Sequence, residues 1–374
     1  NYHDAYNSLP SAAAAQGTMF DSGTTYLKFY PNAGSPGTGN RNGSEKLVWS
    51  THVAVLPFNE QAARYEAVRR VTSDSYGGKA TVAAYQGTGP DGFIRSNEGG
   101  LDAHWKDGSQ SALDLHAATG GIISIYICPS DPNARSFGRN GTARTNIMTS
   151  RGDSMNANQW ASEEAGDGWK CSKRGAFAPH TWNEFSAIQD GLSNTLAAAE
   201  GVTAPTTTDV EMSSGGNHVV KGGAYLSGGT PLNAVNTARS PGDRNLLNNF
   251  STGTRVRTWR GQWYASGNVS ITGFCTVIRP NDISYGQDGT NTWGVYTAQS
   301  YHPGGVSALN CDGSVKFIPD TIDNGNLVYP GTSTPVANGG FPAPYSKNLD
   351  DFGASPFGVW GAAGTIGGGE STSL

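Results

Sequence analysis

The sequence predicts a single β-rich α+β domain, and three observations support this fold class. Charged residues make up only 15% of the 374-residue chain, which contains 52 glycines, a composition typical of loop-rich extracellular β proteins. Several short apolar runs bounded by turn residues have the composition of strands. Asp312-Gly313 lies between two such runs and is a strong β-hairpin signal. The length allows one large domain or two ordinary ones with a sizeable core, and we expect a single domain over residues 1–374.

The charge and the cysteines narrow the class of protein. The formal net charge is -5 and the basic residues are scattered, so no nucleic-acid-binding surface is indicated. The sequence contains no apolar run long enough to span a membrane. The cysteines lack the C-x-x-C spacing of zinc or redox sites, which favours one or two disulfides in an oxidising compartment over buried free thiols. The disulfide candidates are Cys128, Cys171, Cys275 and Cys311.

The chain opens on what we expect to be the end of a helix. Within residues 1–10 the helix is expected to end before Pro10, because a proline disfavours the α conformation in the residue before it. The earlier part of this helix is expected to be missing. Residues 11–45 are expected to form a loop with one strand at 26–30. Within this loop, residues 21–24 match the Asp-Ser/Thr-Gly-Thr motif of aspartic proteases. That chemistry needs two carboxylates and no second motif occurs, so a polar turn is the favoured interpretation.

The next segment combines apolar runs with short helices. Residues 47–58 are apolar and precede a helix expected at 60–70. His52 has no Cys, Asp or second His at metal-ligand spacing, so we expect it at the edge of the core. A second helix is expected at 111–118. A strand at 122–128, closed by a rigid turn, would place Cys128 well for a disulfide.

The middle of the chain offers weaker signals. Arg151-Gly152-Asp153 matches an adhesion tripeptide that is also frequent by chance. Residues 187–201 predict a turn that leads into a strand, and Glu200 at its end is expected to pair with a basic group rather than to bind a cation. Strands are expected at 258–264 and 274–278, and the aromatic residues of 202–300 could line a sugar-binding surface or contact another subunit. Four sequons compatible with surface glycosylation lie at Asn42, Asn140, Asn249 and Asn268.

The hairpin around Asp312-Gly313 allows the most detailed prediction. A type I′ turn with these residues at its tip would pair Cys311 with Ser314, and this pair sets the register of both strands. One face would carry Val306, Ala308, Val315 and Phe317, and the other would carry Ser307, Leu309, Cys311, Lys316 and Ile318. Since both faces are partly apolar, we expect both of them to be covered.

The polar residues around this hairpin suggest at most a cation site. Clustered oxygen ligands on a loop suit Ca²⁺, and the candidates are Asp312, Asp320 and Asp323, although Asx turns and a helix start are the favoured interpretation. His302 precedes the first strand, about 20 Å from Asp312 at about 3.3 Å per residue, so a direct pair is not expected. We expect a structural role for His302, with Pro303-Gly304-Gly305 bending the chain into the strand.

The spacing of His302, nine residues and Asp312-Gly313 resembles the His-x9-Asp-Gly signature of a family of pilin-like bacterial proteins often called DUF1559, abundant in planctomycetes and their relatives. Five further segments are similar to the family in the same order. They are residues 1–10, residues 49–61 with Trp49 and Leu56-Pro57-Phe58, the Cys-Pro-Ser-Asp-Pro element at 128–132, residues 187–201, and residues 355–370.

The resemblance implies a pilin-like fold, in which an N-terminal helix, truncated here, packs on an antiparallel sheet. Residues 73–186 and 202–300 would be large loop-rich insertions, residues 302–323 the hairpin of the signature, and residues 331–374 a Gly- and Pro-rich tail that docks on the domain. The membrane would be contacted only through the missing part of the helix.

We therefore expect a structural subunit of an extracellular filament or secretion pseudopilus that self-associates into a helical polymer at the cell surface. A cell-surface polysaccharide-binding module is the alternative. A hydrolase would have to use Asp21, His302 and Asp312, which nothing in the sequence brings together, so we do not expect an enzyme or a catalytic site.

Overall fold

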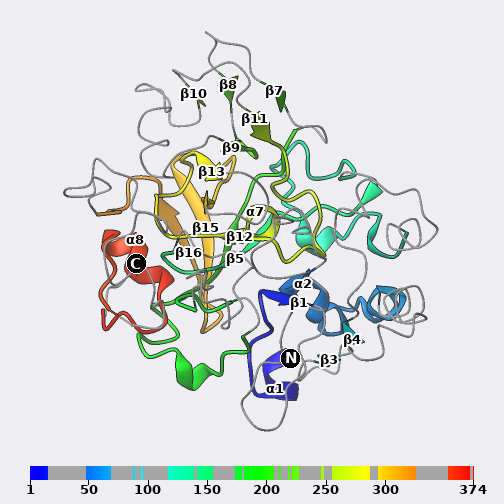
Figure 1. The fold of residues 1–374 in the computed structure, drawn as a ribbon, viewed down its shortest axis with the longest axis horizontal. Helices are drawn as coiled ribbons and strands as arrows, with labels where there is room; N and C mark the ends of the chain where they lie inside the picture. The colour runs from blue at the N-terminus through cyan, green and yellow to red at the C-terminus, as the bar shows by residue number, and fades with distance from the viewer. Residues whose placement is uncertain are drawn as a thin grey trace, which may run out of the picture.

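The computed structural model describes residues 1–15, 48–68, 87–88, 94–95, 117–138, 141–154, 173–178, 181–205, 210–211, 218–219, 221–226, 246–247, 255–286, 294–325, 353–370 and 374. Over these residues the chain has an α+β fold with few, short helices and two mixed sheets (Figure 1). The predicted α+β class is confirmed at this level. No helix within the described ranges combines the length and the hydrophobicity of a membrane span.

The helices are short and lie mostly between strands. The α-helices are α1 (Tyr2–Tyr6), α2 (Thr51–Ala54), α7 (Val269–Thr272) and α8 (Gly358–Gly364), and the 3-10 helices are η2 (Leu56–Phe58), η4 (Ser124–Tyr126) and η6 (Phe185–Ala187). Residues 62–68 are also helical, within the helix expected at 60–70.

Two five-stranded sheets form the framework. The central sheet has the order β12-β5-β6-β15-β16, formed by β12 (Gly273–Phe274), β5 (Ile147–Ser150), β6 (Leu196–Glu200), β15 (Gly305–Asn310) and β16 (Val315–Pro319). Only the β12–β5 pair in it is parallel. The second sheet has the order β14-β13-β9-β11-β7, formed by β14 (Gly294–Val295), β13 (Ser284–Gly286), β9 (Ala224–Leu226), β11 (Arg255–Arg257) and β7 (Val210–Glu211).

Three two-stranded ladders complete the described strands. They join β1 (Ala13–Ala15) to β2 (Val48–Ser50), β3 (Gly87–Thr88) to β4 (Ile94–Arg95), and β8 (His218–Val219) to β10 (Leu246–Leu247). The strand expected at 26–30 and the protease-like motif at 21–24 lie outside the described residues.

Helix α1 ends where the sequence predicts. Asn1 caps its N-terminus by accepting a hydrogen bond from the backbone of Asp4, and Asn7 ends the helix with a left-handed φ of 52°. The side chain of Tyr2 packs edge-on against Phe58 in η2. This contact ties the start of the chain to the segment 48–68.

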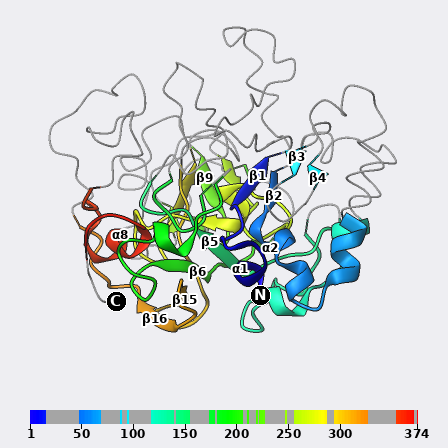
Figure 2. The ribbon, with the colours of Figure 1, turned by 90° about the horizontal axis from the view of Figure 1, so that it is seen from below.

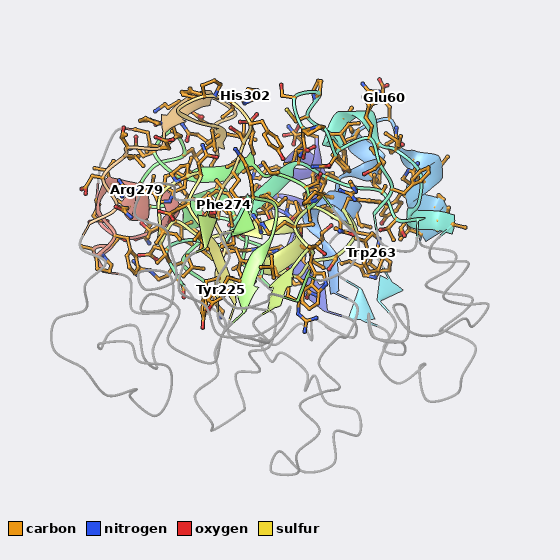
Figure 3. The ribbon with its side chains drawn as sticks, turned by 90° about the horizontal axis from the view of Figure 1, so that it is seen from above. Glu60, Tyr225, Trp263, Phe274, Arg279 and His302 are labelled. Carbon is orange, nitrogen blue, oxygen red and sulfur yellow. The ribbon has the colours of Figure 1, made fainter. Side chains whose placement is uncertain are left out.

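The main core lies on one face of the central sheet, against α8. Trp360 is fully buried there, stacks on Phe274, and donates its indole N–H to the carbonyl oxygen of Ile278. Figure 3 shows Phe274 in the interior and His302 at the edge of the molecule. The apolar residues of this face are Met148, Leu196, Ala199, Phe274, Ala298, Val306, Ala308, Ile318, Trp360 and Ala363.

The hairpin β15–β16 forms as predicted, but its register differs from the prediction by one residue. Leu309 pairs with Val315, not with Lys316. Only Gly313 in the turn has a left-handed backbone, with φ of 88°, and its N–H donates to the carbonyl of Asn310. The connection is therefore a three-residue loop with a type I turn and a glycine bulge, and the type I′ prediction was wrong.

The shift in register changes the faces of the hairpin. Because side chains alternate along a strand, a slip of one residue moves Val315 and Phe317 to the face of Ser307 and Leu309. The buried face carries Val306, Ala308 and Ile318. The other face is exposed at Leu309, Val315 and Phe317, so the expectation that both faces are covered was wrong.

Three predicted strands are shorter than expected or absent. Residues 122–128 contain the 3-10 helix η4, and residues 258–264 are turns after β11. Only Phe274 of the strand expected at 274–278 lies in a strand. The guanidinium of Arg260, within the 258–264 run, is buried and donates to the carbonyls of Val269 and Thr297. Burial lowers the pKa of Arg260 to about 10.

Candidate functional site

Three side chains from distant segments meet at the exposed side of the central sheet. They are Cys128 after η4, Glu200 at the end of β6, and His302 just before β15. The Nδ1 atom of His302 lies 3.1 Å from Oε2 of Glu200. The thiol of Cys128, a carboxylate oxygen of Glu200 and a ring nitrogen of His302 all lie within 4.8 Å of one another. All three residues are partly buried.

Glu200 is the centre of this cluster. Its Oε2 accepts a hydrogen bond of 2.7 Å from the backbone N–H of Ser307 in β15. Its carbonyl oxygen accepts one of 3.0 Å from the N–H of Gln299, in the segment that leads to His302. The end of β6 therefore fixes both the carboxylate and the chain that carries the histidine.

His302 is held by a tight loop. Its backbone N–H donates to Oγ of Ser300 at 3.0 Å, and the Ser300 hydroxyl donates to the carbonyl of Gly305 at 2.7 Å. Asn281, whose backbone has a left-handed φ of 60°, accepts from the N–H of Ser300. These bonds fix the backbone of His302 and therefore the direction of its side chain.

Cys128 is positioned by the buried side chain of Asn146. Oδ1 of Asn146 accepts from the N–H of Cys128 at 2.8 Å, while its Nδ2 donates at 2.7 Å both to Asp131 and to the carbonyl of Gly201. The Asp131 carboxylate also accepts from the N–H and the hydroxyl of Thr203. This network joins the Cys-Pro-Ser-Asp-Pro loop directly to the end of β6.

The sequence singled out all three residues but not their association. Glu200 was expected to pair with a basic group, which is His302, and Asp312 was correctly excluded as the partner of the histidine. Glu200 and His302 lie 102 positions apart along the chain, so no local pattern relates them. The only available signal was that each belongs to a different segment of the family resemblance.

The structure does not bring the three calcium candidates together. Asp312 lies at the tip of the hairpin, where its Oδ1 accepts from the N–H and hydroxyl of Ser314, and these bonds hold the pKa of its carboxyl below the usual value. Asp320 lies at the opposite end, and its N–H donates to the carbonyl of Gly304. Asp323 accepts from the N–H of Gly325. Asx-type turns, which the sequence favours over a calcium site, account for the hydrogen bonds of Asp312 and Asp323.

The described cysteines are free thiols. The expected disulfide joins none of Cys128, Cys275 and Cys311, while Cys171 lies outside the described residues. Burial raises the pKa of both the Cys275 and the Cys311 thiols to about 12. These two thiols are therefore poor nucleophiles, because the thiolate is the reactive form.

Other motifs prove to be structural. His52 is buried, and burial lowers its pKa to about 4, while its Nε2 donates to the carbonyl of Ile147. Arg151 and Asp153 of the Arg-Gly-Asp tripeptide are buried, and Asp153 forms a bidentate ion pair with Arg174. The sequon residue Asn268 is also buried, which leaves no room for a glycan there.

A second feature of the same side is an apolar strip on the hairpin, formed by Leu309, Val315 and Phe317. The exposed fractions of these residues are 36%, 67% and 54%. All three lie on one face, and β16 is the outermost strand of the described central sheet. Figure 2 shows the hairpin and α1 on the same side of the molecule.

Comparison with known proteins gives one match. Residues 1–325 match the model of a family described as "Protein of unknown function (DUF1559)". The match covers most of the chain and confirms the resemblance. No curated protein and no solved structure matches the chain.

Proposed function

Because the chain belongs to the DUF1559 family, whose description assigns no activity, we propose that it is a pilin-like structural subunit of an extracellular filament or pseudopilus. The observation that carries this proposal is the apolar strip of Leu309, Val315 and Phe317 on the β15–β16 hairpin, whose strand β16 is the outermost of the described central sheet. Exposed apolar side chains gathered on one sheet face are typical of surfaces that another protein covers.

The strip favours contact through side chains more than through the strand edge. Pro319 ends β16 and cannot donate a backbone hydrogen bond, and Lys316 lies within the same strand, and both features discourage edge-to-edge pairing. The outward face of the hairpin has no such protection. A second copy of the chain that covers this face with a different part of its own surface would make a heterologous contact, and repetition of that contact produces a helical polymer.

The position of α1 agrees with this arrangement. α1 and the hairpin β15–β16, which carries the strip, lie on the same side of the molecule in Figure 2. In a pilin-like subunit this side would face the filament interior, where helices pack on the sheets of neighbouring subunits. The extracellular or cell-surface location is part of the same proposal.

The polysaccharide-binding alternative gains no support from the buried aromatic residues of the described chain. That hypothesis depended on aromatic residues of 202–300 at the surface. The described aromatics of this region that are buried include Tyr225, Trp263, Tyr264, Phe274, Tyr285 and Tyr296. Buried rings cannot stack on a sugar, so these residues do not favour the alternative over the filament subunit; Trp259 is only partly buried, and Phe250 and Trp293 lie outside the described residues.

The test is electron microscopy of cells that produce the natural gene product, compared with the double variant Val315→Thr and Phe317→Thr. Threonine preserves the strand preference, so the variant should fold while the strip becomes polar. Lys316→Thr, in the same strand but on the other face, is the matched control. We expect filaments from the natural protein and the control but not from the double variant. Absence of filaments in all three would refute the proposal.

A further inference from the structure

We propose that Cys128, Glu200 and His302 bind a Zn²⁺ ion. This site does not depend on the filament: it would bind the ion in an isolated subunit. The thiol, one carboxylate oxygen and one imidazole nitrogen are three donors from three segments of the chain, and they all lie within 4.8 Å of one another.

The distances suit a tetrahedral ion. Zinc bonds of about 2.0–2.3 Å place the ligand atoms of a tetrahedron about 3.3–3.8 Å apart. The observed separation between Nδ1 of His302 and Oε2 of Glu200 is 3.1 Å, and all three donor atoms fall within 4.8 Å. The largest separation that this limit allows exceeds the tetrahedral distance by about 1 Å, a movement within the freedom of partly buried side chains.

The surroundings hold the ligands in place before the ion arrives. The N–H of Ser307 donates to Oε2 of Glu200, which orients the carboxylate. Asn146 fixes the backbone of Cys128 to the residue after Glu200, through its bonds to Cys128 N–H and Gly201 C=O. Ser300 fixes the backbone of His302. Hydrogen-bonded supports of this kind raise the affinity of a site, because the ligands are already ordered and lose less conformational freedom when the ion binds.

The donor set selects the metal. A thiolate and an imidazole are ligands for zinc and similar transition ions, whereas Ca²⁺ and Mg²⁺ prefer oxygen alone. On binding, the thiol proton of Cys128 passes to solvent and the sulfur takes up the ion as a thiolate, with no change of oxidation state. Three protein ligands leave a fourth position for water, and the partial exposure of all three residues gives the ion a path to the site.

The simpler interpretation is an ion pair between Glu200 and His302 beside an unrelated thiol. It explains the 3.1 Å contact but assigns no role to Cys128, so the two interpretations differ in whether the sulfur is a ligand. The thiol is therefore the group to test.

The experiment uses the chelator-stripped, untagged chain, kept reduced with a phosphine. Zn²⁺ alone is titrated in competition with a chromophoric chelator, and Co²⁺ is used as a spectroscopic probe. We expect one Zn²⁺ per chain and, with Co²⁺, a thiolate-to-metal charge-transfer band. Failure of the unsubstituted chain to bind Zn²⁺ stoichiometrically, or a Co²⁺ spectrum without that band, would overturn the proposal.

Two cysteine variants test whether the sulfur of Cys128 is a ligand of the ion. Cys128→Ser should weaken Zn²⁺ binding by at least about 100-fold, since changes outside the ligands already cost 10–100-fold. It should also abolish the charge-transfer band. Cys311→Ser, a partly buried thiol elsewhere, is the matched control and should change neither. A band that persists in Cys128→Ser, or equal losses in both variants, contradicts the assignment.

A labelling measurement keeps the test independent of how the variants fold. In the unsubstituted chain, Zn²⁺ should slow iodoacetamide modification of Cys128, read by peptide mass spectrometry, and leave the slow modification of Cys311 unchanged. Equal labelling of Cys128 with and without Zn²⁺ would overturn the proposal.

Discussion

Replacement of Asn146 by alanine tests whether this buried amide joins the Cys128 loop to the end of β6. The change removes one hydrogen bond to the Asp131 carboxylate and two to backbone groups, those of Cys128 and Gly201. A bond to a charged group contributes about 1.5–3 kcal/mol and a neutral bond about 0.5–1.5 kcal/mol. Because losses within one network are not additive, we expect a decrease of about 3 kcal/mol in the free energy of unfolding.

Thermal unfolding followed by circular dichroism measures this effect. With an unfolding entropy of about 2.1 cal/mol/K per residue, a chain of 374 residues loses about 4 °C in Tm for 3 kcal/mol. The matched control is Asn194→Ala, which removes one neutral hydrogen bond, to the carbonyl of Asp190, at a partly exposed site. It should lower Tm by about 1 °C. Equal shifts for the two variants would refute the role assigned to Asn146.

Three further predictions follow from buried groups. Asp153→Ala should lower the unfolding free energy in urea by about 3–5 kcal/mol, because it leaves the buried guanidinium of Arg174 without its carboxylate; a cost below 1 kcal/mol would contradict this. Burial lowers the pKa of His52 from its ordinary value of 6.5 to about 4 in the folded chain, so only the unfolded chain gains this proton as the pH falls from 6.5 to 4. Stability should therefore fall by about 3 kcal/mol over that window, and His52→Gln, which keeps a donor for Ile147, should reduce the loss; identical pH profiles would show that another group is responsible. Finally, native-state alkylation at pH 8 should leave Cys275 unmodified, since burial raises its pKa to about 12; rapid labelling would place this thiol at the surface.

The fold class was predictable because composition and short apolar runs do not depend on long-range contacts. The hairpin was predictable as an element, but its register was not, because Asp-Gly fits either a type I′ turn or the second half of a type I turn with a glycine bulge. The hydrogen bonds from Ser314 to Asp312 accompany the second form. That one-residue difference decides whether Phe317 is buried or exposed.

The candidate site was predictable only as separate residues. Glu200 and His302 meet because β6 pairs with β15, and pairings of this kind are fixed by the whole sheet and not by local sequence. Similarly, the 258–264 run has the composition of a strand, but the buried guanidinium of Arg260 bonds to carbonyls further along the chain and the run forms turns. Long-range contacts of this type can override the strand propensity of the local sequence.

Sedimentation velocity over a range of concentrations is the most direct test of self-association through the hairpin strip. For the natural gene product we predict a sedimentation coefficient that rises with concentration as large species form, and for the Val315→Thr, Phe317→Thr double variant we predict a constant, monomeric value. A natural protein that stays monomeric at every concentration, or a double variant that associates equally well, would contradict the account.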